Sequence, residues 1–332
     1  MFKTAIIGCG AIAQSHVSFL KELNNVKICA LCDILPERAK NTKEKFDLDC
    51  ITYDDYVKML NENKLDAVHI CTPHYLHSEM AIEALKRDIN VILEKPVAIT
   101  LKQAEDLLSV ANKSNAKICI SFQNRYLSRN KTVKELIKSG KAGKIKHING
   151  NVLWHRTEGY YKNSHWRGFK ASEGGGVLIN QAIHTLDLIH WFCGDVDSVC
   201  ANCGNFHFKD VIDVEDTVCA SINFKNGAKC LFNATNGNYK DNPISIEIVC
   251  ENMIIELKEN ALFIDGVKQE LCDNIDGYIG KDYWGIGHYM LFKNFYNNLE
   301  NNINMDIDVS EATKVLKTLL AIYESNGKTI KM

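Results

Sequence analysis

Short apolar runs alternate with amphipathic segments through the first part of the chain. The apolar runs lie at residues 4–7, 26–32, 66–72, 90–93 and 117–122. Segments with apolar residues at helical spacing separate them, for example residues 75–86 and 101–111. Strands that alternate with helices are typical of βαβ units with right-handed crossovers, which place the strands in one parallel sheet. We therefore predict an α/β domain over residues 1–122.

The remainder of the chain changes to consecutive strand-like runs. They lie at residues 145–156, 198–208, 216–224, 228–235, 244–249 and 253–257. Asn226-Gly227 separates two of them and is a strong hairpin signal. Hairpin spacing implies antiparallel pairing, so we predict a second domain over residues 123–332 with a mainly antiparallel sheet. Helices are predicted at residues 130–139, 177–192, 282–299 and 310–325.

The first apolar run ends in a glycine turn, Gly8-Cys9-Gly10-Ala11-Ile12-Ala13, and a helical pattern follows. Gly8 can make a tight turn because it has no Cβ, and Gly10 lets the backbone approach a pyrophosphate closely. Ala13 stands where this fingerprint allows glycine or alanine, so that the helix can pack on the strand. The N–H groups and dipole of the helix start then face the phosphates. The turn therefore predicts a Rossmann domain that binds a dinucleotide.

Asp33 ends the second apolar run, about 20 residues after Ala13, where an acidic ribose-binding residue is expected. A carboxylate at this position accepts hydrogen bonds from the ribose hydroxyls and repels a 2′-phosphate. The sequence therefore favours NAD over NADP as the cofactor. The alternative is an exposed turn carboxylate before Pro36.

The composition narrows the class of protein. The 332 residues are 46% hydrophobic and 24% charged, which is ordinary for a globular protein. A formal net charge of −2 gives no sign of nucleic-acid binding, and no apolar run is long enough to span a membrane. The first strand begins directly after Met1-Phe2-Lys3, so no signal peptide is expected.

Thirteen cysteines are present, and many of them lie in apolar runs. An odd number of cysteines in such positions favours reduced thiols in the cytoplasm over a disulfide framework. Cys200-Ala-Asn-Cys203 has the C-x-x-C spacing, but it lies in a strand-like run, so no metal or redox role is expected for it. We predict a cytoplasmic protein with no metal site and no nucleic-acid or membrane partner.

Glu94-Lys95-Pro96 follows a predicted strand of the parallel sheet, at the edge where ligands bind. An ammonium group held beside a nicotinamide can hydrogen-bond a substrate hydroxyl and favour the alkoxide as hydride leaves. Lys95 is therefore a candidate catalytic residue, and a cis Pro96 would fix the direction of its side chain. The alternative is an exposed ion pair between Glu94 and Lys95.

Asn180 and His184 lie on the helix predicted after Gly174-Gly175-Gly176. Positions i and i+4 share a helix face, so both side chains can point into one cleft. His184 can accept the hydroxyl proton because the pKa of histidine lies near neutrality. A lone helical histidine is more often structural, and it is the combination with Lys95 that favours the catalytic interpretation.

Together these motifs resemble the Gfo/Idh/MocA family, which includes glucose–fructose oxidoreductase and inositol dehydrogenase. The resemblance rests on the glycine turn, Asp33, Cys71-Thr72-Pro73 with His77, Glu94-Lys95-Pro96 and residues 173–187, in family order across the chain. It implies an N-terminal Rossmann domain and a C-terminal α/β domain for substrate binding and oligomerisation, whose open sheet often forms the dimer. It also implies oxidation or reduction of a sugar or cyclitol carbon with NAD or NADP.

The resemblance also implies roles for individual residues. Lys95 and His184 match the catalytic pair of the family, whereas Asn180 stands where many members have an aspartate. Asparagine can orient a sugar hydroxyl but cannot take up a proton, so a His–Asp relay is not implied. Cofactor contacts are implied for Gly8, Gly10, Ala11, Ile12, Asp33, Cys71, Thr72, Pro73, His77, Glu94, Lys95, Asn124 or its neighbour Gln123, Trp166, Arg167 and Tyr283. Substrate contacts are implied for Lys95, Arg125, Arg156, Tyr160, Asn180 and His184, with loop packing as the alternative for Arg125, Arg156 and Tyr160.

These motifs do not fix the substrate. Asn180-Gln181 before the histidine is similar to UDP-N-acetylglucosaminuronate 3-dehydrogenases, which favours a sugar or nucleotide-sugar substrate. Two alternatives share the fold: a glycosidase that retains NAD and oxidises its substrate transiently, and a regulator that senses the dinucleotide without turnover. The presence of both Lys95 and His184 argues against the regulator. We expect a homodimer or homotetramer formed through the C-terminal sheet.

Overall fold

The computed structural model describes residues 1–258, 260–271 and 286–332. The chain divides into two compact units, each with its own sheet. The first unit contains Met1–Tyr126 and the described residues from 286 to Thr313. The second contains the described residues from Leu127 to 271 together with Lys314–Met332.

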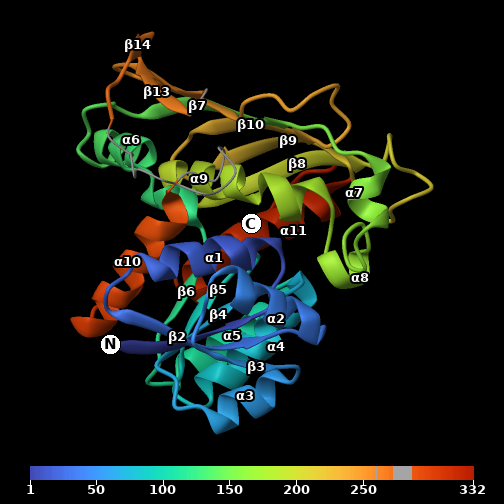
Figure 1. Cartoon of the computed structure of the whole chain (residues 1–332). Helices are drawn as coiled ribbons and strands as arrows, with labels where there is room; N and C mark the ends of the chain where they lie inside the picture. The colour runs from blue at the N-terminus through green and yellow to red at the C-terminus, as the bar shows by residue number, and fades with distance from the viewer. Residues whose placement is uncertain (259, 272–285) are drawn as a thin grey trace. The chain divides into compact units, whose positions relative to one another are not determined.

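The first unit is built on a six-stranded parallel sheet with the spatial order β3-β2-β1-β4-β5-β6 (Figure 1). Its strands are β1 (Phe2–Ile7), β2 (Val26–Cys32), β3 (Ile51–Tyr53), β4 (Ala67–Ile70), β5 (Asn90–Leu93) and β6 (Ile118–Ile120). Its helices are α1 (Ala11–Lys21), α2 (Pro36–Lys45), α3 (Tyr56–Glu62), α4 (His77–Leu85), α5 (Leu101–Ala111), α10 (Gly287–Glu300) and the short η1 (His74–Leu76) and η2 (Gln123–Tyr126). The strand order reverses between β1 and β4, and ligands of such sheets bind outside the carboxyl ends of the strands at this point.

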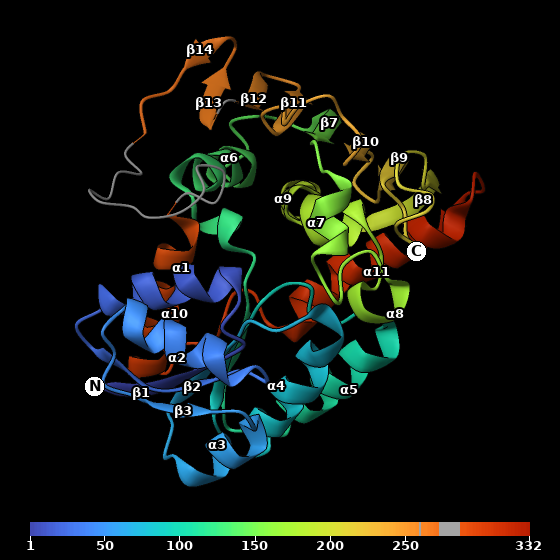
Figure 2. The same ribbon diagram turned by 45° about the vertical axis from the view of Figure 1, so that its right-hand side comes forward.

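Helices cover both faces of this sheet. In Figure 2, α1 and α10 lie on one face, and α4 and α5 lie on the other. Strands buried on both faces must be apolar throughout, which explains why the sequence shows continuous apolar runs here. Helix α10 is far from α1 in the sequence but packs on it, with the rings of Phe292 and Phe19 6.5 Å apart. The sequence predicts a helix at residues 282–299 but does not indicate this partner.

The second unit contains a nine-stranded mixed sheet with the order β14-β13-β12-β11-β7-β10-β9-β8-β15. Its strands are β7 (Ile145–Leu153), β8 (Val196–Gly204), β9 (Thr217–Phe224), β10 (Lys229–Thr235), β11 (Ser245–Cys250), β12 (Ile254–Lys258), β13 (Ala261–Ile264), β14 (Val267–Lys268) and β15 (Ile330–Lys331). Its helical segments are α6 (Ser128–Lys138), α7 (Glu158–Lys162), α8 (Lys170–Glu173), the π-helical η3 (Leu178–Ala182), α9 (Ile183–Cys193) and most of α11 (Val309–Ser325). Strands β7 and β10 pair in parallel, and the other described pairs are antiparallel, including the predicted β9–β10 hairpin at Asn226-Gly227.

Helices α6 and α9 lie on one face of this second sheet, and α9 packs against β7 (Figure 2). Gly150 of β7 permits the close approach, because a Cβ there would lie 2.6 Å from Cδ1 of Ile189. Side chains along β9 and β10 alternate between buried and accessible, as expected for a sheet with one covered face. The apolar face is thus covered within the same unit.

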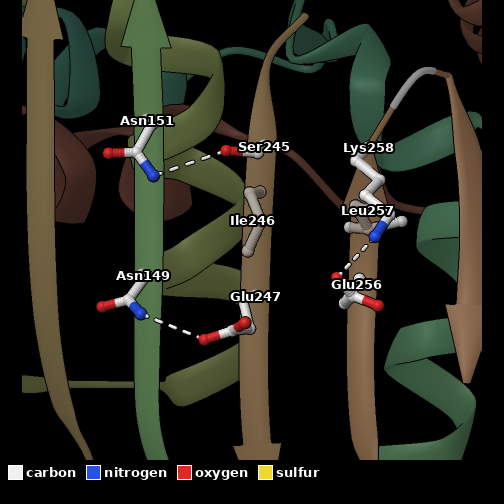
Figure 3. A pocket seen from close by; sticks show the side chains of 8 residues that line it. All are labelled: Asn149, Asn151, Ser245, Ile246, Glu247, Glu256, Leu257 and Lys258. Atoms are coloured by element: carbon white, nitrogen blue, oxygen red, sulfur yellow. Dashed lines mark hydrogen bonds and ion pairs between the residues drawn. The ribbon is translucent and has the colours of Figure 1, made fainter. Parts of the chain in front are cut away.

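The opposite face of the second sheet carries polar side chains that bond across neighbouring strands. Asn149 donates to Glu247 at 3.1 Å, and Asn151 donates to Ser245 at 3.4 Å (Figure 3). A pocket lies here, lined by Asn149, Asn151, Ser245, Ile246, Glu247, Glu256, Leu257 and Lys258. None of these residues is a predicted site residue. Homo-oligomerisation through this sheet stays a prediction.

Two further features bear on the class of protein. No helix in the described ranges combines the length and apolar character needed to cross a bilayer. Cys200 and Cys203 are free thiols on β8, and an odd spacing on a strand sends their side chains to opposite faces of the sheet. Cys29 and Cys32 share the same spacing on β2 and are also free thiols.

Candidate active site

The predicted glycine turn lies between β1 and α1, at the carboxyl end of the first strand. Gly8 has a φ of +88°, and a Cβ there would lie 2.7 Å from the carbonyl oxygen of Cys71. Apart from its chain neighbours, the described residues place no atom within 4 Å of the Cβ position at Gly10, so the backbone is open to a ligand. Gly10 is also the N-cap of α1 and makes no side-chain cap, which leaves the first-turn N–H groups directed at this space. These properties fit a pyrophosphate.

Asp33 lies directly after β2 and is only 6% exposed, so it is not the exposed turn carboxylate of the alternative reading. Its Oδ2 accepts the N–H of Cys9 at 2.8 Å, and its Oδ1 accepts the N–H of Leu35 at 2.9 Å. A carboxylate has about four acceptor positions, so Asp33 can brace the glycine turn and still receive ribose hydroxyls. Burial and the charge of Asp33 raise the pKa of the Cys9 thiol to about 12.

Three buried polar atoms lie just after β4 and β6 at the ligand edge of the parallel sheet. They are Thr72 Oγ1, Ser121 Oγ and Gln123 Oε1, and the described residues offer them no hydrogen-bond partner. Buried polar atoms rarely stay unpaired in proteins, so these atoms fit the polar groups of a bound dinucleotide. The sequence analysis named Thr72 and Gln123 but missed Ser121, whose signal is a polar residue directly after an apolar strand.

His77 supports this edge from inside the unit. The ring is fully buried, and its two nitrogens lie 2.7 Å from the carbonyl oxygen of Pro96 and 2.9 Å from that of Thr72. Burial lowers the pKa of His77, which favours the neutral ring. The neutral ring carries one N–H, so it donates either to the turn after β5 or to the turn after β4, and only the protonated ring can donate to both. The Lys95–Pro96 peptide bond is cis, as the sequence suggested.

Glu94 and Lys95 are consecutive residues at the end of β5 with opposite environments. Lys95 is the one residue between Val91 and Ala98 that is not buried, whereas Glu94 is 6% exposed. The alternative of an exposed Glu94–Lys95 ion pair is therefore wrong. Oε1 of Glu94 instead lies 3.0 Å from Nε2 of His16 and 3.2 Å from Nε2 of His288.

A chain of buried hydrogen bonds ends at the Glu94 carboxylate. Nδ1 of His16 lies 2.9 Å from Nδ1 of His69, and Nε2 of His69 lies 2.9 Å from the hydroxyl of Tyr296. One proton assignment satisfies every link, with Tyr296 donating to His69, His69 to His16, and both His16 and His288 to Glu94. Burial opposes the Glu94 anion, but the hydrogen bonds from His16 and His288 outweigh it and hold the pKa of Glu94 well below its usual value. Burial also lowers the pKa of His16 and His69.

The ligand atoms of His16, Glu94 and His288 all lie within 4.8 Å of one another, a spacing that metal sites also show. The proton assignment above accounts for these short contacts through hydrogen bonds alone. The cluster is therefore a hydrogen-bonded network that fixes the carboxylate of Glu94, the residue before Lys95.

Asn180 and His184 are the two residues between Gly175 and His190 that are not buried. The segment that carries them is not the continuous α-helix predicted from the sequence. Residues Leu178–Ala182 are π-helical, and α9 begins at Ile183. Short π segments within helices occur frequently at functional sites. The predicted catalytic residues of this unit therefore share the accessible side of an otherwise buried segment.

Glu173, which the sequence analysis did not assign to the site, contacts Asn180 directly. Its Oε1 accepts a hydrogen bond from Nδ2 of Asn180, and its Oε2 accepts the N–H of Gly168 at 2.5 Å. Burial raises the pKa of Glu173 to about 7. The signal that could have found it is an acidic residue directly before three glycines at the start of a helical segment.

A second buried carboxylate, Glu215, lies against the segment that follows the triple glycine. It accepts the N–H groups of Gly176 and Leu178 at 2.8 and 2.9 Å and the hydroxyl of Tyr323 at 3.0 Å. A Cβ on Gly175 would lie 2.0 Å from the Tyr323 hydroxyl, and one on Gly176 would lie 1.8 Å from the Glu215 carbonyl oxygen. Burial raises the pKa of Glu215 to about 7.

Arginine and aromatic side chains alternate in a stack in the second unit. Cζ of Arg156 lies 4.9 Å from the ring centre of Trp154 and 5.4 Å from that of Tyr160. Cζ of Arg167 lies 4.9 Å from the ring centres of both Tyr160 and Trp166. The aromatic faces hold two guanidinium groups in place, an arrangement suited to anions and planar carboxylates. Arg156 also pairs with Asp241 at 3.1 Å.

The remaining predicted residues fall into both units. Arg125 is buried in the first unit and forms an ion pair with Glu311 at 3.0 Å. Asn124 lies beside it on η2 and is half-buried. Cys71 is buried, and burial raises the pKa of its thiol well above the usual value. Tyr283 lies outside the described residues. The predicted catalytic residues are thus divided, with Lys95 in the first unit and Asn180 and His184 in the second.

The glycine turn, the buried Asp33 and the parallel sheet define a dinucleotide-binding domain joined to a second α/β domain. The chain matches the model of the oxidoreductase family with an NAD-binding Rossmann fold over residues 2–122, and that of the GFO/IDH/MocA C-terminal domain over residues 130–256. It belongs to the GFO/IDH/MocA family of NAD-binding oxidoreductases. The predictions of the family, the fold class, the NAD cofactor and an oxidoreductase activity are confirmed.

Several named relatives share this sequence or structure. D-glucoside 3-dehydrogenase of Escherichia coli is 30% identical over 68% of this chain and 67% of the relative. Inositol 2-dehydrogenase of Salmonella typhimurium is 26% identical over 58% of this chain, and the match spans only 55% of that relative's length. The WlbA dehydrogenase of Bordetella pertussis, solved in complex with NADH and UDP-GlcNAcA, has a TM-score of 0.88 and is 27% identical, with 100% of this chain and 98% of that chain covered.

Proposed function

We propose that the protein uses NAD to oxidise, or NADH to reduce, one ring carbon of a sugar derivative, with a nucleotide sugar as the favoured class. The observation that carries the proposal is the placement of Lys95. It is the accessible residue at the carboxyl end of β5, in the unit whose glycine turn and Asp33 fit the cofactor. His184 and Asn180 are the accessible residues of their segment in the second unit.

The chemistry follows from these side chains. Bound NAD supplies the acceptor for the hydride. The ammonium group of Lys95 donates a hydrogen bond to the substrate oxygen and stabilises the negative charge that develops on it. His184 accepts the hydroxyl proton while the C–H bond breaks and its electron pair leaves the carbon, so that a carbonyl forms. Asn180 holds a neighbouring hydroxyl, and the reverse sequence describes reduction.

Two observations favour an anionic sugar derivative. Arg156 and Arg167 stack on rigid aromatic supports, which suits a phosphate or a carboxylate, and Asp241 offsets one of the two positive charges by pairing with Arg156. The WlbA dehydrogenase, which is similar to this chain over its whole length, was crystallised with UDP-GlcNAcA. A neutral sugar would leave this charge without a counterpart in the substrate.

The test is hydride transfer to NAD, measured as NADH absorbance, over a matched panel of alcohols. UDP-GlcNAcA and UDP-GlcNAc differ only in the carboxylate, and a D-glucoside and myo-inositol lack the nucleotide. We expect NADH formation to be fastest with a nucleotide sugar. Release of an aglycone without net NADH would replace the proposal with the NAD-retaining glycosidase, and tight NAD binding with no turnover of any alcohol would replace it with the regulator.

A further inference from the structure

Glu173 and Asn180 form a hydrogen bond that joins a buried charge to an accessible polar side chain. Nδ2 of Asn180 donates to Oε1 of Glu173, while the N–H of Gly168 occupies Oε2 at 2.5 Å. Glu173 is 1% exposed and lies at the end of α8, and the half-buried Asn180 lies in η3. The bond therefore connects two elements across the triple glycine.

This hydrogen bond fixes the direction of the Asn180 amide. An ionised carboxylate only accepts hydrogen bonds, so above its raised pKa of about 7 Glu173 selects the NH₂ end of the amide. Since the amide group is planar, the carbonyl oxygen Oδ1 is then held on the side away from Glu173. An asparagine without a partner of this kind can present either end, because the two ends have nearly the same size and shape.

We propose that Glu173 is a positioning residue that makes Asn180 a hydrogen-bond acceptor, and that Oδ1 of Asn180 receives a hydroxyl or N–H donor of the substrate. This inference rests on the proposed function and deepens it, because it assigns the hydrogen-bond polarity of one substrate contact. The ligand group at this position is a ring hydroxyl or an acetamido N–H, and a carbonyl or a methoxy group is excluded from it.

The arrangement also explains why an asparagine suits this position. An aspartate at residue 180 would place a second carboxylate against Glu173, and two such groups at one buried site cannot both ionise at low cost. Asparagine provides an acceptor oxygen of the same geometry and places no second carboxylate beside Glu173. An aspartate at residue 180 would present a carboxylate to the substrate. This chain presents the amide of Asn180 instead, and the carboxyl group of Glu173 is buried.

The experiment is an exchange of polarity between the two residues. Glu173→Gln supplies an amide that no longer selects one end of Asn180, and Asn180→Asp places two carboxylates together. Each single variant is expected to lower kcat/KM for the best substrate by roughly 10-fold or more. In the double variant the new glutamine donates to the new aspartate, whose other oxygen accepts from the substrate, so kcat/KM should recover to within about 3-fold of wild type. If the fold-losses in kcat/KM of the two single variants multiply in the double variant, the proposal is overturned.

Glu215→Gln is the matched control. Glu215 is also buried and binds the N–H groups of the same segment, but it bonds Gly176, Leu178 and Tyr323. Combining Glu215→Gln with Asn180→Asp is expected to give no recovery. If kcat/KM recovers equally in the two double variants, the loss of any nearby carboxylate is enough to offset Asn180→Asp. That result would contradict a specific role for Glu173.

A second measurement needs no substrate. Protein labelled with ¹⁵N in the asparagine side chains gives an NH₂ resonance that Asn180→Asp removes and thereby assigns. This resonance should move with pH as Glu173 titrates near pH 7, and it should stop moving in Glu173→Gln. A resonance insensitive to both pH and Glu173→Gln would overturn the inference. The Asn180 resonance could respond to pH and to Glu173→Gln as expected in a protein that oxidises no alcohol. That result would overturn the proposed function but not the role of Glu173.

Discussion

The carboxylate of Asp33 accepts a hydrogen bond from the backbone N–H of Cys9, at 2.8 Å, inside the glycine turn. The N–H of Leu35 holds the other carboxylate oxygen at 2.9 Å. The residue expected to recognise the ribose thus also braces the loop expected to receive the pyrophosphate. One side chain therefore couples two parts of the cofactor site.

Replacing Asp33 should weaken cofactor binding by more than one lost ribose contact. Asp33→Ala removes the acceptor for the ribose and frees the Cys9 N–H, which together cost about 2–4 kcal/mol, a rise in the NADH Kd of roughly 30- to 1000-fold. Asp33→Asn keeps one acceptor oxygen and should fall between this variant and wild type. Fluorescence titration with NADH measures the Kd of each variant. Wild-type NADH affinity in Asp33→Ala would show that Asp33 is structural only.

The buried network around Glu94 should be a large contributor to stability. Glu94→Ala leaves the buried N–H groups of His16 and His288 without their acceptor, and we expect a loss of about 2–5 kcal/mol in the free energy of unfolding. Glu37→Ala is the control, because Glu37 forms an exposed ion pair with Lys40 and should cost less than about 1 kcal/mol. Urea unfolding compares the two. Equal losses of unfolding free energy in the two variants would contradict a stabilising role of the network.

The sequence predicts most of the fold because its signals are local. Each apolar run predicts the strand that it forms. The glycine turn and Asn226-Gly227 each predict a turn at their own position. The sequence does not reveal partners that are distant in the chain, such as the packing of α10 on α1 or the parallel pairing of β7 with β10. The triple glycine is visible as a helix start, but the sequence does not show that Tyr323 and Glu215 approach too closely for a side chain at Gly175 or Gly176.

The same limit applies to the candidate site. Lys95 follows a strand end and Asn180 and His184 have helical spacing, so these residues could be identified from their own surroundings. The hydrogen bond between Glu173 and Asn180 crosses a turn and depends on a π segment that no simple periodicity predicts. Glu173 belongs to the motif at residues 173–187, but the sequence gives no sign of its contact with Asn180.

The two units should respond to pH in opposite directions. In the first unit, the folded-state pKa values of His16, His69 and Glu94 are lowered, so the unfolded chain binds protons more readily. Their contribution to stability is present above the unfolded pKa values and is lost as pH falls through and below them. In the second unit, the pKa values of Glu173 and Glu215 are raised from 4.5 to about 7. The folded state then holds extra protons, so stability falls as pH rises across that range.

Hydrogen exchange followed by mass spectrometry measures this difference. After correction for intrinsic exchange rates, the slowest amides of β1 and β4 should open more readily at about pH 5 than at about pH 7. The slowest amides of β9 and α9 should become better protected on the same acidification. A parallel loss of protection in both units on acidification would contradict the opposite signs of the two sets of pKa shifts.

The central claim is hydride transfer at a site that depends on Lys95. The most direct measurement uses the best alcohol from the panel, deuterated at the reacting carbon, with mass analysis of the NADH formed by wild type, Lys95→Ala and Lys102→Ala. Lys102 is an exposed lysine of the same unit, paired with Asp106. We predict deuterated NADH from wild type and Lys102→Ala, and a kcat lowered roughly 100- to 10,000-fold in Lys95→Ala with NADH binding retained. Undeuterated NADH, or full activity in Lys95→Ala, would contradict the account.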